Sequence, residues 1–313
     1  MQRRCTLADL NVNLGGKLQL KNPVMTASGT FGYGVEYDEF FPISELGAVV
    51  VKGIAPLPVH GNPTPRIAET VSGMLNAVGL QGPGVDNFLH DPHYLPYLRK
   101  AGATTIVNMW GKKVEDYAYV AERLEKEKDG IAAIEVNVSC PNIKEGGISF
   151  GTDTKSMQSV ISAVRNATTL PMIVKLSPNV TRIADFAMAA EDAGADMISL
   201  INTIPAMAID IETRRPKLAN VTGGLSGPCV KPVAIKMVYE ASRAVKIPVI
   251  GMGGIMNGKD AIEFFLAGAS AVAVGTAIFA DPEAPVRVIR EINEWLDQHN
   301  IAKITDIIGQ VNV

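Results

Sequence analysis

A cysteine lies where a buried strand is predicted to end. Residues 137–142 read Asn-Val-Ser-Cys-Pro-Asn and directly follow the apolar run 131–136. In a parallel α/β fold, ligands bind and chemistry occurs at the carboxyl ends of strands. A free thiol has a pKa of about 8.5, close enough to neutrality to accept a proton, whereas a core cysteine would lie inside the strand and stay inert. The polar neighbours and the strand-end position favour Cys140 as a catalytic residue.

Two lysines also end predicted strands. Lys52 follows three valines and Lys175 follows Ile-Val. Because burying a lysine without a partner is costly, each is expected to face a ligand anion or an electron-rich ring. The alternative is a lysine at the rim of the fold whose ammonium group reaches solvent.

Four asparagines extend this pattern. Asn108, Asn137 and Asn202 come directly at the ends of apolar strands, and Asn76 belongs to the same predicted face. Carboxamides both donate and accept hydrogen bonds, which suits a ligand with alternating C=O and N–H groups, such as a pyrimidine ring. They could instead be turn residues, but their strand-end positions favour binding.

Glycine-rich segments follow the last predicted strands. They are Ile250-Gly-Met-Gly-Gly-Ile255 and Val274-Gly-Thr-Ala277, with Gly223-Gly-Leu-Ser-Gly227 as a third candidate. Glycines allow backbone N–H groups to approach phosphate oxygens, and loops after the last two strands form the recurrent phosphate site of α/β barrels. Tight turns are the alternative, but two such exits on adjacent strands favour a phosphorylated ligand.

Composition excludes several other classes. The chain has 313 residues, a net charge of −3 and no basic run, which argues against nucleic-acid binding. Cys5, Cys140 and Cys229 are an odd number and far apart, which argues against disulfides, a zinc site or an iron–sulfur cluster. The four histidines show no spacing for a metal. We expect a protein of the reducing cytoplasm without a signal peptide or membrane helix.

The elements needed to position these residues form a repeating pattern. Eight short apolar runs lack alternation, as expected for strands covered on both faces: 24–27, 48–51, 104–108, 133–137, 172–175, 197–200, 248–251 and 271–274. Amphipathic helices are predicted over 114–128, 154–165, 182–193, 231–244, 259–267 and 285–298. Alternating strands and helices predict an α/β protein, specifically a (β/α)₈ TIM barrel forming a single domain over residues 1–313.

The sequence also predicts a hairpin and two long connections in addition to the barrel. Residues 10–21 alternate around Gly15-Gly16, which predicts a β-hairpin over one end of the fold. Two long connections, 52–102 and 202–230, leave the carboxyl ends of strands. Connections of this length usually bind ligands or cover a site.

At this point the chain resembles a known family, class 1 dihydroorotate dehydrogenase, and most closely class 1B. The matching segments occur in the family's order and span most of the chain: 27–34, 51–53, 76–80, 137–142, 174–178, 201–203, 223–227, 251–254 and 274–276. Cysteine at position 140 resembles class 1, since the membrane-linked class 2 carries serine there. Lys144-Glu-Gly-Gly147 resembles class 1B rather than the fumarate-using class 1A.

The resemblance implies a catalytic subunit that binds flavin mononucleotide (FMN) and oxidises (S)-dihydroorotate to orotate in pyrimidine biosynthesis. Cys140 would remove the C5 proton while hydride leaves C6 for the flavin. The substrate-binding residues it implies are Lys52, Asn76, Ala77, Val78, Gly79, Leu80, Asn137, Asn202 and Thr203. The FMN-binding residues it implies are Ser28, Lys52, Gly53, Asn108, Asn137, Lys175, Ile201, Gly227, Gly253, Gly254, Gly275 and Thr276.

The resemblance also implies a partner. Because this chain lacks a cysteine cluster, class 1B chemistry needs a second subunit carrying FAD and a [2Fe–2S] centre to reach NAD⁺. The expected assembly is a heterotetramer built on a dimer of this chain. Three alternatives stay open: a class 1A enzyme or dihydropyrimidine dehydrogenase, a non-redox lyase or isomerase acting on a sugar phosphate, and a non-catalytic binding barrel.

Overall fold

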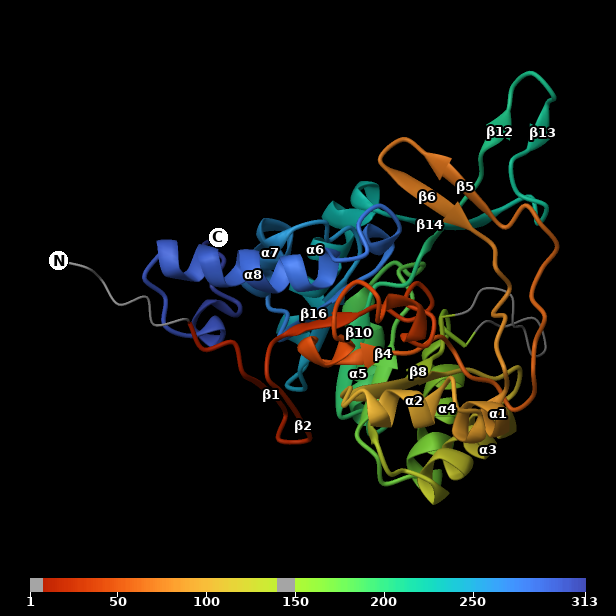
Figure 1. The fold of residues 1–313 in the computed structure, drawn as a ribbon, viewed down its shortest axis with the longest axis horizontal. Helices are drawn as coiled ribbons and strands as arrows, with labels where there is room; N and C mark the ends of the chain where they lie inside the picture. Colours follow the sequence, from red (N-terminus) through yellow and green to blue (C-terminus); the bar gives the residue numbers. More distant parts are fainter. Residues whose placement is uncertain (1–7, 140–149) are drawn as a thin grey trace.

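Eight parallel strands form the centre of the protein in a computed structural model, which describes residues 8–139 and 150–313 (Figure 1). The strands are β3 (Val24–Thr26), β4 (Val49–Val50), β7 (Thr105–Met109), β8 (Ile131–Asn137), β9 (Met172–Lys175), β10 (Met197–Leu200), β15 (Val249–Met252) and β16 (Ala271–Val274). Their spatial order is β3-β16-β15-β10-β9-β8-β7-β4. A parallel bridge between Met25 and Ala48 joins the two end strands, so the sheet closes. The predicted (β/α)₈ barrel is confirmed.

Amphipathic helices cover the outside of this barrel. They are α3 (Val114–Lys126), α4 (Thr154–Ala167), α5 (Ile183–Asp192), α6 (Lys231–Ala244), α7 (Gly258–Ala267) and α8 (Ala284–Gln298). Local signals set their ends: the Asp153 carboxylate accepts from the Ser156 N–H at 2.8 Å to begin α4, and α7 ends at Gly268. The six predicted helices are therefore confirmed, with small shifts at their ends.

The first barrel unit differs from the repeating pattern. After β3 the chain forms two 3₁₀ helices, η1 (Val35–Tyr37) and η2 (Ile43–Glu45), instead of an α-helix. Phe31 and Tyr37 stack there with ring centroids 4.2 Å apart, so aromatic packing covers this part of the barrel. Further 3₁₀ helices lie later in the chain: η3 (Pro228–Val230), η4 (Thr276–Phe279) and η5 (Ile304–Ile307).

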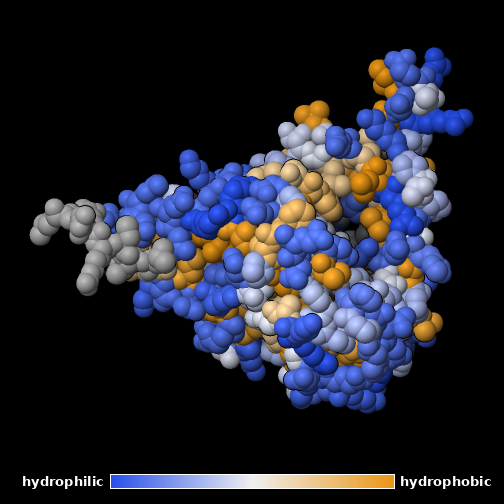
Figure 2. All heavy atoms as spheres, in the orientation of Figure 1, coloured by the Kyte–Doolittle hydropathy of each residue, from blue (hydrophilic) through white to orange (hydrophobic). Residues whose placement is uncertain are grey.

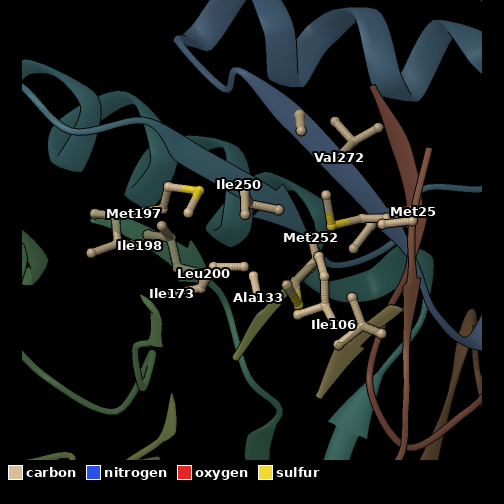
Figure 3. Packing of buried hydrophobic residues seen from close by; sticks show 14 of the residues in the cluster. Met25, Ile106, Ala133, Ile173, Met197, Ile198, Leu200, Ile250, Met252 and Val272 are labelled. Atoms are coloured by element: carbon tan, nitrogen blue, oxygen red, sulfur yellow. The ribbon is translucent and has the colours of Figure 1, made fainter. Parts of the chain in front are cut away.

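The barrel interior is apolar at depth and becomes polar toward the carboxyl ends of the strands. Figure 3 shows Ile106, Ala133, Ile173 and Met252, which come from four strands, gathered in the interior. All four are buried. Side chains two residues further along a strand face the same way, so the next layer above Ile106 and Ile173 contains Asn108 and Lys175.

The predicted hairpin is present and covers the end of the barrel opposite the site. Strands β1 (Val12–Leu14) and β2 (Leu18–Leu20) pair antiparallel around Gly15 and Gly16. Lys17 in the turn forms an ion pair at 3.9 Å with Asp196, which directly precedes β10. The hairpin therefore lies against the amino ends of the strands.

The two long connections pair with each other, which sequence patterns did not predict. The first contains β5 (Ile67–Thr70), β6 (Gly73–Asn76), α1 (Val85–His90) and α2 (Leu95–Lys100), and the second contains β11 (Ile204–Ala206), β12 (Ile209–Asp210), β13 (Arg215–Pro216) and β14 (Gly223–Ser226). Four of these strands form an antiparallel sheet in the order β11-β14-β6-β5. Figure 1 shows β5, β6 and β14 projecting on the side opposite β1 and β2. No helix in the described parts of the chain is long and apolar enough to cross a membrane.

Candidate active site

A cavity of about 360 Å³ lies between the carboxyl end of the barrel and the projecting sheet. Figure 2 shows hydrophobic residues gathered where the sheet meets the body of the molecule. Every predicted binding residue lines this cavity: Ser28, Lys52, Gly53, Asn76, Ala77, Val78, Gly79, Leu80, Asn108, Asn137, Lys175, Ile201, Asn202, Thr203, Gly227, Gly253, Gly254, Gly275 and Thr276. Their individual roles stay predictions. Cys140 lies outside the described residues.

Asn137 and Asn202 form a hydrogen-bonded group with Ser139. The Asn137 Oδ1 accepts from the Ser139 N–H at 3.2 Å, from the Ser139 hydroxyl at 2.8 Å and from Asn202 Nδ2 at 3.4 Å. Asn202 Nδ2 also donates to the Ser139 hydroxyl, and its Oδ1 accepts from the Thr203 N–H at 2.8 Å. With Oδ1 of Asn137 occupied in this way, its Nδ2 is left to donate to a ligand in the cavity.

Asn108 and Asn76 have the opposite orientation. Asn108 Nδ2 donates to the buried carboxylate of Glu135 at 2.6 Å, and Asn76 Nδ2 donates to the Gly224 carbonyl at 3.3 Å. Within the described parts of the chain, neither Oδ1 atom accepts a hydrogen bond, so both remain as acceptors. The cavity wall therefore offers donors and acceptors at different positions, as recognition of a ring with alternating C=O and N–H groups requires.

Two lysines add positive charge to this wall. Lys175 is 4% exposed, and its Nζ donates to the Ser28 hydroxyl at 3.1 Å. Lys52 is half-buried, and burial together with the nearby Arg66 lowers the pKa of its ammonium group from the ordinary value of 10.5, against a smaller opposing effect of Glu36. Among the described residues, neither lysine forms an ion pair with a carboxylate. Both therefore suit an anionic ligand, as predicted.

Another part of the cavity lining, the glycine wall, consists of Gly227, Gly253, Gly254 and Gly275. Gly254 has a φ of 80°, and a Cβ built there would lie 2.8 Å from the Gly227 carbonyl oxygen and 3.1 Å from the Lys231 backbone nitrogen. Gly253 has a φ of 124°, and Gly227 and Gly275 border the same wall. Only glycine permits this close approach of two loops, the one after β15 and the one that leads into α6. Glycine-rich loops of this kind can present backbone N–H groups to a phosphate. The donor set of the cavity thus fits a planar, phosphate-bearing cofactor.

Sequence patterns missed part of this site. The residues missed are Ile67, Met74, Pro205, Leu225 and Phe279 in the lining, with Glu135 and Ser199 beneath it. The apolar lining residues belong mostly to the projecting sheet, and no local pattern reveals that the two connections pair. Glu135 could have been found from the sequence, because it is the one charged residue in the apolar run 131–136.

Comparison with known proteins identifies a family whose members match nearly the whole chain. The family model described as dihydroorotate dehydrogenase matches residues 10–296. The chain belongs to the dihydroorotate dehydrogenase family. Among curated relatives, the "dihydroorotate dehydrogenase B (NAD(+)), catalytic subunit" of Geobacter sulfurreducens is 55% identical, with 97% of this chain and 99% of the relative covered. A protein of the same name from Bacteroides fragilis is 54% identical, with 98% and 100% covered.

Family membership sets aside two of the alternatives that the residues left open. Dihydroorotate dehydrogenases are flavin-dependent oxidoreductases, so the non-redox barrel and the non-catalytic barrel are set aside. The relatives named above carry the NAD⁺-linked name over almost their full length. The resemblance noted from the motifs is thereby confirmed.

Proposed function

We propose that this chain is the FMN-binding catalytic subunit of an NAD⁺-linked dihydroorotate dehydrogenase and oxidises dihydroorotate to orotate. The observation that carries the proposal is that one cavity is lined by oriented carboxamides, two lysines and glycine-bearing loops together. The carboxamides and lysines suit the carboxylate and ring amides of the substrate and the flavin ring. The glycine loops suit the flavin phosphate.

In this proposal, substrate binding depends on charge and on the carboxamide pattern. Lys52 attracts the substrate carboxylate, and its partial burial strengthens that attraction relative to a fully solvated lysine. Asn137 and Asn202 offer hydrogen bonds from one side, and the segment Asn76–Leu80 closes over the substrate from the projecting sheet. Holding the ring in one orientation is what makes proton removal from C5 selective.

Cys140 is proposed as the base that removes this C5 proton. It is joined to Ser139, which is hydrogen bonded to the two cavity residues Asn137 and Asn202. This network fixes the chain directly before Cys140 at the cavity wall. Bound FMN supplies the hydride acceptor.

The electron path is proposed to leave this chain through a partner. The curated relatives are named catalytic subunits, which agrees with a second subunit. We propose that the partner carries FAD and a [2Fe–2S] centre and passes electrons to NAD⁺, and that the complex is a cytoplasmic heterotetramer.

The test begins with the visible spectrum of the purified chain. A flavin spectrum that bleaches when dihydroorotate is added anaerobically, with one FMN per chain released on denaturation, would support the proposal. A colourless chain that gains no flavin absorbance when reconstituted with FMN would contradict it. Bleaching by dihydropyrimidines lacking the carboxylate as fast as by dihydroorotate would favour the dihydropyrimidine dehydrogenase alternative.

A further inference from the structure

One carboxylate lies inside the barrel beneath the cavity and has no role in the proposed reaction. Glu135 is on β8 and 2% exposed. Asn137, which lines the cavity, is two residues further along the same strand and faces the same way, so Glu135 lies about 6.6 Å deeper. Burying a carboxylate costs several kcal/mol unless its oxygens are hydrogen bonded, so a buried glutamate in an apolar strand needs a physical explanation.

Neutral donors from two strands hold this carboxylate. Its Oε2 accepts from Asn108 Nδ2 at 2.6 Å, and its Oε1 accepts from the Ser199 hydroxyl at 2.7 Å. Asn108 is the register neighbour of Glu135 on β7, and Ser199 lies on β10 beyond β9. Among the described residues, no lysine, arginine or histidine forms an ion pair with Glu135. Within the described parts of the chain, both carboxylate oxygens are therefore held by neutral hydrogen-bond donors.

The carboxylate determines how Asn108 is oriented. A carboxamide has two orientations of nearly equal shape, and its partners select one of them. Because Asn108 donates its NH₂ group down to Glu135, its Oδ1 faces up toward the cavity. That oxygen lies 2.9 Å from the place where a Cβ on Gly53 would be, so it borders the cavity beside Gly53.

We propose that Glu135 is a positioning residue that makes Asn108 an obligatory acceptor for the ring N–H of the flavin, and that its charge also lowers the flavin reduction potential. The inference rests on the proposed function, because it requires FMN in this cavity. The oxidised isoalloxazine ring carries one N–H, at N3, and this is the ring atom that an acceptor can recognise. Reduction adds negative charge to the ring, which a nearby buried anion opposes.

The test compares two flavins in two variants. The apo chain is titrated with FMN and with N3-methyl-FMN, which lacks the ring N–H. Glu135→Leu removes the acceptor for Asn108, whereas Glu135→Gln keeps one acceptor oxygen and removes the charge. We expect Glu135→Leu to reduce the ratio of FMN affinity to N3-methyl-FMN affinity by about 2- to 12-fold. This factor corresponds to the free energy of one hydrogen bond. Glu135→Gln should retain most of that preference, and both variants should have a raised reduction potential.

Ser199→Ala is the matched control. It removes the other hydrogen bond to the same carboxylate but leaves the charge and Asn108 in place. We expect Ser199→Ala to keep the wild-type preference between the two flavins. If Glu135→Leu weakens both flavins equally, or if the potential is unchanged in Glu135→Gln, the inference is wrong. Failure of the wild-type chain to bind FMN at all would instead overturn the proposed function, and this inference with it.

Discussion

At the scale of single residues, the carboxamides of the cavity are oriented by their protein neighbours before any ligand binds. Asn137 has its oxygen engaged by Ser139 and Asn202, and Asn108 has its NH₂ group engaged by Glu135. A ligand therefore meets groups that no longer need to be ordered, which reduces the entropy cost of binding. The same preorganisation makes the site selective, because a ligand with its donors and acceptors exchanged would leave these groups unpaired.

Cys140→Ala tests the proposed base. We expect the variant to keep FMN but to lose proton removal from C5, and removing a general base typically costs a factor of about 10²–10⁴ in rate. The measurement is flavin bleaching by dihydroorotate in anaerobic single-turnover stopped flow at neutral pH. Cys140→Ser should also be severely impaired, because a hydroxyl is a far weaker base than a thiolate. Bleaching by Cys140→Ala at close to the wild-type rate would exclude the assignment.

Lys52 should set the alkaline limit of substrate capture. A lysine attracts an anion only while protonated, so capture falls as pH rises through its pKa. Burial and Arg66 lower that pKa below 10.5, so the fall begins at a lower pH than for an ordinary lysine. We expect kcat/KM for dihydroorotate to decline on the alkaline side. In Lys52→Arg, whose guanidinium stays protonated, this decline should move to higher pH. An identical alkaline limb in both proteins would contradict this role.

Lys175 should stabilise the reduced flavin. Its ammonium group is buried at the cavity wall and is hydrogen bonded to Ser28. Lys175→Met removes the charge while keeping a similar side-chain volume. We expect weaker FMN retention or a lower reduction potential, measured by flavin release and by redox titration. Full FMN occupancy together with an unchanged potential would count against this role.

At the scale of elements, two loops from different parts of the barrel meet at the glycine wall. Gly254 lies against the Gly227 carbonyl, and the N-terminal end of α6 follows directly. The loop after β15 and the segment from Gly227 to the first turn of α6 can be this close only because Gly254 has no side chain between them. The phosphate-binding prediction therefore depends on contacts between loops as much as on the glycines within each loop.

Gly254→Ala tests this packing. The added Cβ would lie 2.8 Å from the Gly227 carbonyl oxygen, so the loops must separate and FMN affinity should fall at least tenfold, which corresponds to about 1.4 kcal/mol. Gly16→Ala is the control, because Gly16 also has a positive φ, 72°, but no atom lies within 4 Å of its added Cβ. That control should lose about 1 kcal/mol of stability and no FMN affinity. Equal FMN affinity in the two variants would contradict the proposed phosphate wall.

At the scale of the whole molecule, the barrel and the projecting sheet contribute different residues to the cavity. The barrel positions the lysines, carboxamides and glycine loops, while the sheet of β11, β14, β6 and β5 brings Asn76–Leu80 over the cavity. The sequence has no cysteine cluster and no Gly-x-Gly-x-x-Gly motif after a strand, so we expect the second redox centre to lie on a partner.

Electron transfer to NAD⁺ should therefore require a second subunit. We expect the isolated chain to bleach its flavin with dihydroorotate but to reduce NAD⁺ very slowly. Rapid NAD⁺ reduction should appear when an iron–sulfur flavoprotein subunit is added, measured by NADH absorbance. Equal rates with and without that subunit would contradict the proposed electron path. Rapid turnover with fumarate alone would indicate class 1A behaviour instead.

The sequence alone was sufficient for the repeating elements and for assigning the predicted binding residues to one cavity, while their roles stay predictions. Barrel strands and helices depend on local periodicity and local capping, as at Asp153 and Gly268, so their positions could be read directly. Strand-end residues such as Asn137 and Lys175 could be assigned to one face, because all strands of a parallel barrel end on the same side. The prediction of a single domain for residues 1–313 stays a prediction.

The tertiary structure decided what depends on partners far apart in the chain. Residues 73–76 and 223–226 pair only because the barrel brings two long connections to the same place. The direction in which Asn108 points depends on Glu135, which is 27 residues away. The Asn108 carboxamide has two orientations of nearly equal shape, and its sequence neighbours do not select between them. Its hydrogen-bond partners select one, and they are assembled only when the barrel closes.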